Sequence, residues 1–181
     1  GMIRILMREF SAGEEGAMLE LARKLGADIP FCMQDRPALC EGIGDVVTPL
    51  EGRIDLPMVL VNCGIHVNTR HAYVLLGRTE NRREDDDYLG KKKMAIKDFV
   101  RTGDISIARK EFVNDFEKAA FSMHPGLEEV KTDLYSSGAS FAIMTGSGSS
   151  MVGLYENEST AEDAALRLSG KYTFVCNTRI L

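Results

Sequence analysis

The pattern that most constrains the fold lies in residues 140–176, where short apolar segments surround a glycine-rich turn and one helix. Residues 140–144 and 151–155 have the pattern of strands, residues 160–168 that of a helix, and residues 172–176 that of a closing strand. A strand, helix, strand unit of this kind indicates helices packed on a sheet. We therefore predict an α+β fold.

The rest of the chain extends this pattern toward the N-terminus. Residues 58–63 form a near-continuous apolar run that suits a buried strand. Further helices are predicted over residues 17–25, 91–101, 104–112, 115–122 and 125–136, and further strands over residues 31–33, 37–40 and 45–49. The turn-rich residues 51–57 predict a boundary near residue 55, and the charged stretch 77–93 predicts a solvated loop.

Composition limits the kind of partner. The 181 residues include 22 basic and 27 acidic side chains, a net charge of −5, and 44% are hydrophobic. Apolar content of this size supports a folded core, whereas binding to nucleic acid or anionic lipid needs concentrated Lys and Arg. The apolar runs are too short to cross a bilayer. We predict a soluble, cytoplasmic protein with no nucleic-acid and no membrane partner.

Residues 145–150, Thr-Gly-Ser-Gly-Ser-Ser, form the densest cluster of small polar residues in the chain. Its two glycines allow backbone N–H groups to face an anion or a ligand to approach closely. A Walker loop would need a Lys, and Met151 stands where a dinucleotide fingerprint has its third glycine. The segment that follows has a strand pattern, so we expect no helix dipole to assist. A plain hairpin turn is the alternative.

Two other groups of residues are candidates for chemistry. Asp28 precedes Ile29-Pro30, and because a proline disfavours the helical region for the residue before it, Asp28 is expected in a short, stiff connection. An ordinary turn residue is the alternative there. Cys63, His66 and His71 could supply three metal ligands, but their spacing matches no established site and a fourth ligand is missing. We predict no metal site.

Five segments, taken in order, resemble the GHMP small-molecule kinases over nearly the whole chain from residue 11. They resemble most the branch that uses ATP to phosphorylate a hydroxyl of a cytidyl substrate in non-mevalonate isoprenoid biosynthesis. The segments are residues 25–31 (LGADIPF), 41–45 (EGIGD), 64–73 (GIHVNTRHAY), 114–117 (NDFE) and 145–150 (TGSGSS).

The resemblance implies a fold and a set of roles. Residues 1–55 would be a remnant of the N-terminal catalytic domain, with a helix, the loop of the catalytic Asp and short strands. Residues 56–181 would be the ferredoxin-like GHMP kinase C-terminal domain. Asp28 matches the catalytic aspartate that accepts or orients the proton of the substrate hydroxyl. The turn beside the phosphates would comprise Thr145, Gly146, Ser147, Gly148 and Ser149.

The cytidyl substrate would meet a different segment. Tyr73 matches an aromatic position that stacks on the cytosine ring, and Thr69 a hydroxyl close to the same nucleotide. Without the resemblance, Tyr73 would be interpreted as a helix residue packed on the core. Residues 114–117 mark the family and are predicted to begin a helix with Asn or Asp as its cap, without a chemical role.

Two motifs of the family do not occur in the 181 residues: an early strand with a Lys that partners the aspartate, and a glycine- and serine-rich loop that holds the ATP phosphates. Residues 2–10, predicted to be helical, match the stretch just after that loop. We therefore expect an N-terminally truncated kinase that is inactive as an isolated chain.

ATP and Mg²⁺ would serve the intact enzyme, and we expect neither to bind this chain tightly. Surface exposed by the missing part predicts a homodimer. The alternative is a noncatalytic nucleotide- or metabolite-binding module derived from the C-terminal domain.

Overall fold

The chain divides into two compact units, which a computed structural model describes over residues 15–34, 36–77 and 86–180. The N-terminal unit comprises Gly1–Arg53 and the C-terminal unit Ile54–Leu181. The helix predicted over residues 2–10 lies outside the described residues.

The N-terminal unit contains two helices and a hairpin. Helix α2 spans Glu15–Leu25 and the short helix α3 spans Ile29–Cys32. Strands β1 (Ala38–Glu41) and β2 (Val46–Pro49) pair antiparallel, and the turn between them contains Gly42 and Gly44 at positive φ. The described part of this unit buries three side chains, those of Ala22, Pro30 and Leu50.

The prediction of a strand over residues 31–33 is wrong, because α3 is helical there. Pro30 lies in the first turn of α3, where the N–H group that proline lacks would have had no partner within the helix. Proline disfavours a helical conformation for the residue before it, here Ile29, but the favourable position of Pro30 in the first turn outweighed this preference. Asp28 consequently begins a helix, with φ −83° and ψ −10°, and does not lead into a strand.

The C-terminal unit is built on a four-stranded antiparallel sheet in the order β4-β5-β3-β6. The strands are β3 (Leu56–Asn62), β4 (Phe141–Met144), β5 (Met151–Leu154) and β6 (Phe174–Ile180). Helical connections join β3 to β4 and β5 to β6, which gives the βαββαβ order of a ferredoxin-like fold. The predicted α+β class is confirmed.

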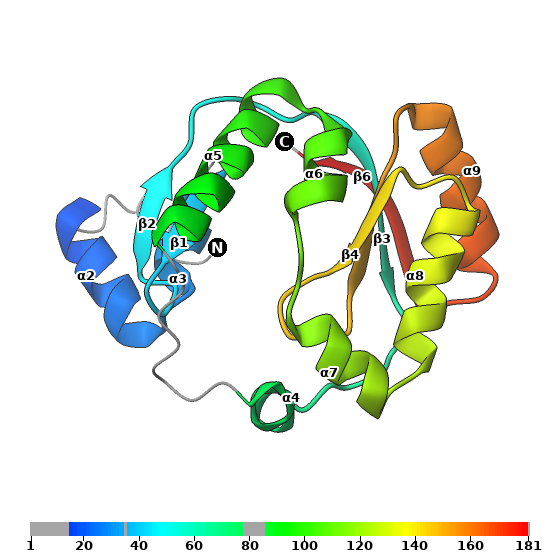
Figure 1. Cartoon of the computed structure of the whole chain (residues 1–181), viewed down its shortest axis with the longest axis horizontal. Coiled ribbons are helices and arrows are strands. Elements are labelled where there is room, and N and C mark those ends of the chain that lie inside the picture. The colour runs from blue at the N-terminus through cyan, green and yellow to red at the C-terminus, as the bar shows by residue number, and fades with distance from the viewer. Residues whose placement is uncertain (1–14, 35, 78–85, 181) are drawn as a thin grey trace. The chain divides into compact units, whose positions relative to one another are not determined.

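Six helices accompany the sheet in the described part of this unit. They are α4 (Thr69–Leu76), α5 (Asp86–Thr102), α6 (Ile105–Glu111), α7 (Phe116–Met123), α8 (Gly126–Ser136) and α9 (Glu158–Ser169). Helix α8 packs against β4 and β5, and α9 against β3 and β6, as Figure 1 shows. Helix α7 packs against α4 and α8, which brings the beginning of α7 near the end of β4.

The core of this unit lies between the sheet and these helices. Buried residues alternate along β3, where Val59 and Val61 are fully covered. Helix α8 contributes Leu127, Val130 and Leu134, whose spacing of three and four places them on one face. The sheet and helices therefore hold the β4–β5 hairpin on a packed base.

The solvated loop predicted over residues 77–93 is wrong for its second half, because α5 begins at Asp86; residues 78–85 lie outside the described residues. Charge alone did not distinguish a loop from a solvated helix. Lys91 and Asp87 form an i,i+4 ion pair of 2.7 Å on the exposed face of α5. Lys92 reaches the backbone oxygen of Glu111 at the end of α6.

Candidate functional site

The glycine-rich segment 145–150 forms the turn of the β4–β5 hairpin. Met144 and Met151 are the last paired residues of the two strands. Thr145 N donates to Ser150 O at 2.8 Å and Gly148 N donates to Thr145 O at 3.0 Å. Gly146 and Gly148 have φ values of +52° and +96°, which favour glycine.

Three side chains from separate elements hold this turn. Asn62, at the end of β3, donates to the Ser150 hydroxyl at 2.9 Å. The hydroxyl groups of Thr69, in the first turn of α4, and Ser147 are 2.8 Å apart and share a hydrogen bond. Asn114 Nδ2 donates to Gly146 O at 2.8 Å. The turn is therefore attached to β3, α4 and the beginning of α7.

The N–H groups of Gly146 and Ser147 donate to no acceptor within the described residues. A Cβ at Gly146 would meet no atom within 4 Å, so this side of the turn is open. Unpaired N–H groups in a glycine turn can bind an anion. The segment after the turn is strand β5, as expected, so no helix follows the turn directly. The N-terminus of α4 lies beside the turn through the Thr69–Ser147 bond.

Helix α4 carries both residues that the resemblance assigns to the substrate. Asn68 caps the helix by accepting a hydrogen bond from His71 N. Tyr73 lies one turn further on, is 52% exposed, and makes a T-shaped contact with the ring of Phe116 at 4.8 Å between ring centroids. The Tyr73 ring is thus fixed by one aromatic contact and remains partly open, as a stacking surface requires.

Asp28 belongs to the N-terminal unit, whereas Thr69, Tyr73 and the turn belong to the C-terminal unit. The Asp28 side chain is exposed, and its Oδ1 lies 2.9 Å from the point where a Cβ on Gly44 would be. Gly44, at φ +104°, therefore allows the β1–β2 turn to approach this carboxylate closely. Desolvation and the negative charge of Asp28 both raise the pKa of the nearby Cys40 thiol.

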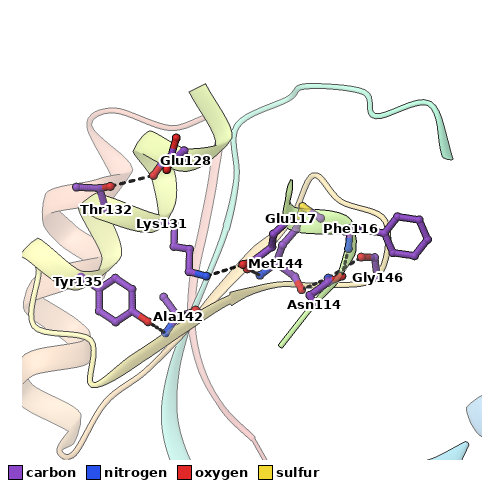
Figure 2. Close-up of polar contacts among 10 residues, drawn as sticks. All are labelled: Asn114, Phe116, Glu117, Glu128, Lys131, Thr132, Tyr135, Ala142, Met144 and Gly146. Carbon is purple, nitrogen blue, oxygen red and sulfur yellow. Dashed lines mark hydrogen bonds and ion pairs between the residues drawn. The ribbon is translucent and has the colours of Figure 1, made fainter. Parts of the chain in front are cut away.

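Asn114 and Glu117, for which the sequence indicated no chemical role, contact the end of β4, and Asn114 also contacts the glycine turn (Figure 2). Asn114 Nδ2 donates to Met144 O at 2.7 Å as well as to Gly146 O, and its Oδ1 accepts from Phe116 N. Glu117 Oε1 accepts from Met144 N at 2.8 Å, and its Oε2 pairs with Lys131 at 2.6 Å. The Asn-Asp-Phe-Glu cluster was visible in the sequence, but its partners about thirty positions away were not.

An open cavity of about 520 Å³ adjoins these residues. Asn114, Glu117, Lys131 and Tyr135 line it together with residues of β4. Glu117 and Lys131 already neutralise one another there.

The described residues contain no group of three or more His, Cys, Asp or Glu side chains that could hold a metal ion. None of the helices described for this chain is long and apolar enough to span a membrane.

Known proteins resemble this chain in sequence and in fold. The family described as "GHMP kinases C terminal" matches residues 95–173. The 4-diphosphocytidyl-2-C-methyl-D-erythritol kinase of Porphyromonas gingivalis is 33% identical over 168 residues, which cover 91% of this chain and 57% of the relative. That of Citrifermentans bemidjiense is 36% identical over 152 residues, covering 84% and 50%. The chain spans about half the length of these curated relatives.

Solved structures agree with the fold. A crystal structure of 4-(cytidine 5'-diphospho)-2C-methyl-D-erythritol kinase superposes on 97% of this chain, and on 60% of its own, with a TM-score of 0.75 and 29% identity. A homoserine kinase from Cytophaga hutchinsonii matches 98% of this chain and 61% of its own with a TM-score of 0.70, at 16% identity. The second match supports the fold alone. Both the resemblance to the GHMP kinases and the predicted fold class are confirmed.

Proposed function

Because the chain contains a GHMP kinase C-terminal domain and is homologous to the C-terminal half of 4-diphosphocytidyl-2-C-methyl-D-erythritol kinases, we propose that it forms part of such a kinase. The reaction would transfer the γ-phosphoryl group of ATP to a hydroxyl of the cytidyl substrate. The observation that carries this proposal is the Thr69–Ser147 hydrogen bond, which joins the segment assigned to the substrate to the turn assigned to the phosphates.

Each proposed role has a physical basis in the chain. Asp28 is an exposed carboxylate at the beginning of the short helix α3, and would accept or orient the proton of the attacking hydroxyl. Tyr73 would stack on the cytosine ring, and Thr69 would lie near the same nucleotide. The open N–H groups of Gly146 and Ser147 would stabilise phosphate oxygens in a preorganised turn.

The described residues offer groups that suit the phosphates of ATP but no set of ligands for Mg²⁺. The open N–H groups of the turn suit the phosphates of ATP, which supplies the transferred phosphoryl group. Because no cluster of metal-ligating side chains exists within the described residues, we assign Mg²⁺ no ligand here. The 181 residues also contain no glycine- and serine-rich loop that leads into a helix. We therefore expect a polypeptide of these residues alone to be inactive.

Reconstitution tests the proposal. The purified chain is mixed with the part of the P. gingivalis kinase that its match leaves uncovered, and ATP-dependent phosphorylation of 4-diphosphocytidyl-2-C-methyl-D-erythritol is measured. We expect activity only in the mixture, and a loss of about a hundredfold or more in kcat for Asp28→Asn. Asp104→Asn, which conserves an exposed cap residue of α6, is the matched control and should retain activity.

Three outcomes would contradict the proposal. One is full activity of Asp28→Asn in the mixture, and another is a preference for homoserine or mevalonate over the cytidyl compound. The third is that the mixture binds a cytidine nucleotide tightly but phosphorylates nothing, which would favour the noncatalytic module. Tyr73→Ala should raise KM for the cytidyl substrate, and Tyr73→Phe should restore it, because stacking needs the ring and not the hydroxyl.

A further inference from the structure

Strand β4 lies at one edge of the sheet, so its outer backbone groups have no neighbouring strand. Such an edge normally exposes unpaired N–H and C=O groups at every second residue. Here side chains from three helices and one connection bond those groups. Arg109 of α6 donates to Ser140 O at 2.9 Å, the Tyr135 hydroxyl of α8 accepts from Ala142 N at 3.1 Å, and Met144 is bonded at both backbone groups by Glu117 and Asn114.

The side chains at the Met144 end reach past the strand into the glycine turn. Asn114 is the one that bonds both segments, because its Nδ2 donates to Met144 O and to Gly146 O (Figure 2). Asn62 and Thr69 hold the turn by serine hydroxyl groups and not by its backbone. Among the side-chain contacts described for the turn, the hydrogen bond from Asn114 to Gly146 O is therefore the one that holds its backbone.

The side chains of Asn114 and Glu117 are themselves held in place. Asn114 Oδ1 accepts from Phe116 N at 2.9 Å, which ties the amide to the beginning of α7. The Glu117 side chain is 16% exposed and is oriented by the 2.6 Å ion pair with Lys131 of α8. Since a turn with two glycines at positive φ has many accessible conformations, fixed external hydrogen bonds select one of them.

We propose that Asn114 and Glu117 are positioning residues that set the conformation of the glycine turn from the beginning of α7. The use of this turn for phosphate binding rests on the function proposed above, whereas the positioning itself does not. Helix α7 thereby fixes the direction of the open N–H groups of Gly146 and Ser147, the preorganisation that binding of a phosphate needs.

Residue-resolved amide hydrogen exchange tests the role of Asn114 in the whole chain. Asn114→Asp preserves an acceptor for Phe116 N but removes both donated bonds. We expect the amides of Thr145 and Gly148 to exchange about tenfold faster, while those of α8 stay within about twofold. Asp104→Ala is the matched control, because it removes a comparable cap, the Asp104–Ser106 bond of α6, away from the turn.

A second pair of variants separates the two functions of Glu117. Glu117→Gln preserves an acceptor for Met144 N and removes the charge that pairs with Lys131, so exchange of the Met144 amide should stay within about threefold of wild type. Glu117→Ala removes the acceptor and should accelerate that amide about tenfold. Recovery by Gln shows that the hydrogen bond, and not the charge, positions the end of β4.

The proposal is overturned if Asn114→Asp leaves Thr145 and Gly148 unchanged, or if Asp104→Ala accelerates them equally. If Asn114→Asp does not fold, Asn114→Ser, which keeps one donor, must accelerate exchange of the same amides relative to those of α8.

In the reconstituted kinase, Asn114→Asp should raise KM for ATP about tenfold and leave KM for the cytidyl substrate within about twofold. The exchange result needs no ligand, so it stands or fails independently of the proposed function.

Discussion

Tyr155 is fully buried at the end of β5, and its hydroxyl has no hydrogen-bond partner among the described residues. Burial raises its pKa to about 12, although the positive charge of Arg167 acts in the opposite direction. An unpaired buried hydroxyl costs about 1–3 kcal/mol of desolvation. We therefore predict that Tyr155→Phe leaves the free energy of unfolding unchanged or raises it by about 1 kcal/mol, measured by urea denaturation.

Tyr172→Phe is the matched control for this prediction. The Tyr172 hydroxyl donates to Asp133 Oδ2 at 2.5 Å, so the same substitution should there lower the free energy of unfolding by about 1–2 kcal/mol. A comparable loss for Tyr155→Phe would show that the Tyr155 hydroxyl has a partner after all.

At the residue scale, sequence reasoning identified side chains but not their partners. The segment with Thr69 and the segment with Ser147 were both predicted to matter, yet their contact spans 78 positions. Asn114 was expected only to cap a helix, and its bond to Phe116 N agrees with that local pattern. Its bonds to Met144 and Gly146 depend on how α7 packs beside β4, which no local pattern contains.

At the scale of elements, a substitution in the first turns of α5 tests whether this segment is helical, where the sequence had predicted a loop. Gly90 lies in α5, and a Cβ there would meet no atom within 4 Å. Glycine in an exposed helix interior costs about 1 kcal/mol relative to alanine. Gly90→Ala should therefore raise the free energy of unfolding by about 0.5–1 kcal/mol, measured by urea denaturation.

Gly77→Ala is its control, because Gly77 also has free space around it but ends α4 at φ +60°. The left-handed conformation disfavours alanine, and we expect a loss of about 1–2 kcal/mol there. An unchanged stability for Gly90→Ala would mean that residues 86–90 are not held in a helix.

A charged cluster joins α8 to the turn before β6 and makes stability depend on pH. Lys171 bonds both Glu129 and Asp133, and Tyr172 bonds Asp133 as well. Burial raises the pKa of Asp133, but the hydrogen bonds from Lys171 and Tyr172 and the charge of Lys171 outweigh it and lower that pKa below 3.8. Asp133 therefore stabilises the fold fully above its unfolded pKa. That contribution decreases as the pH falls below the unfolded pKa and is lost as the pH falls through the lower pKa of the folded state.

Asp133→Asn should accordingly lower the free energy of unfolding at pH 7 by about 1–3 kcal/mol, since it weakens hydrogen bonds to a charged group. The difference from wild type should shrink as the pH falls below 3.8, the ordinary pKa of the carboxyl group. Thermal unfolding followed at several pH values measures this. A difference that does not vary with pH would show that the charge of Asp133 contributes nothing.

The order of helices and strands was largely predictable, because apolar periodicity follows directly from burial on one face. Residues 58–63, for example, were expected as a strand, and β3 covers Leu56–Asn62. The errors arose where two local rules compete. At Pro30 the first-turn preference prevailed over the bias on Ile29, and in α5 charged residues formed a solvated helix face.

At the scale of the whole molecule, the two units differ in how much apolar surface they cover. Within residues 15–34 and 36–53 three side chains are buried, while Leu21, Leu25, Phe31, Ile43 and Val46 are 42–80% exposed. The C-terminal unit instead covers a continuous core between its sheet and helices. Exposed apolar side chains in such number favour association with another surface.

We therefore predict that the purified chain associates with itself as its concentration rises, measured by light scattering after size-exclusion chromatography. Replacing Leu25 and Ile43 by Ser should weaken the association, because they are 61% and 80% exposed in the N-terminal unit. Leu166→Ser is the matched control, since Leu166 is 75% exposed on α9 of the other unit and should have no effect. Adding the N-terminal part of the P. gingivalis kinase should compete with self-association if it covers the same surface. A chain that remains monomeric throughout would contradict the prediction, and equal effects of the three substitutions would place the contact elsewhere.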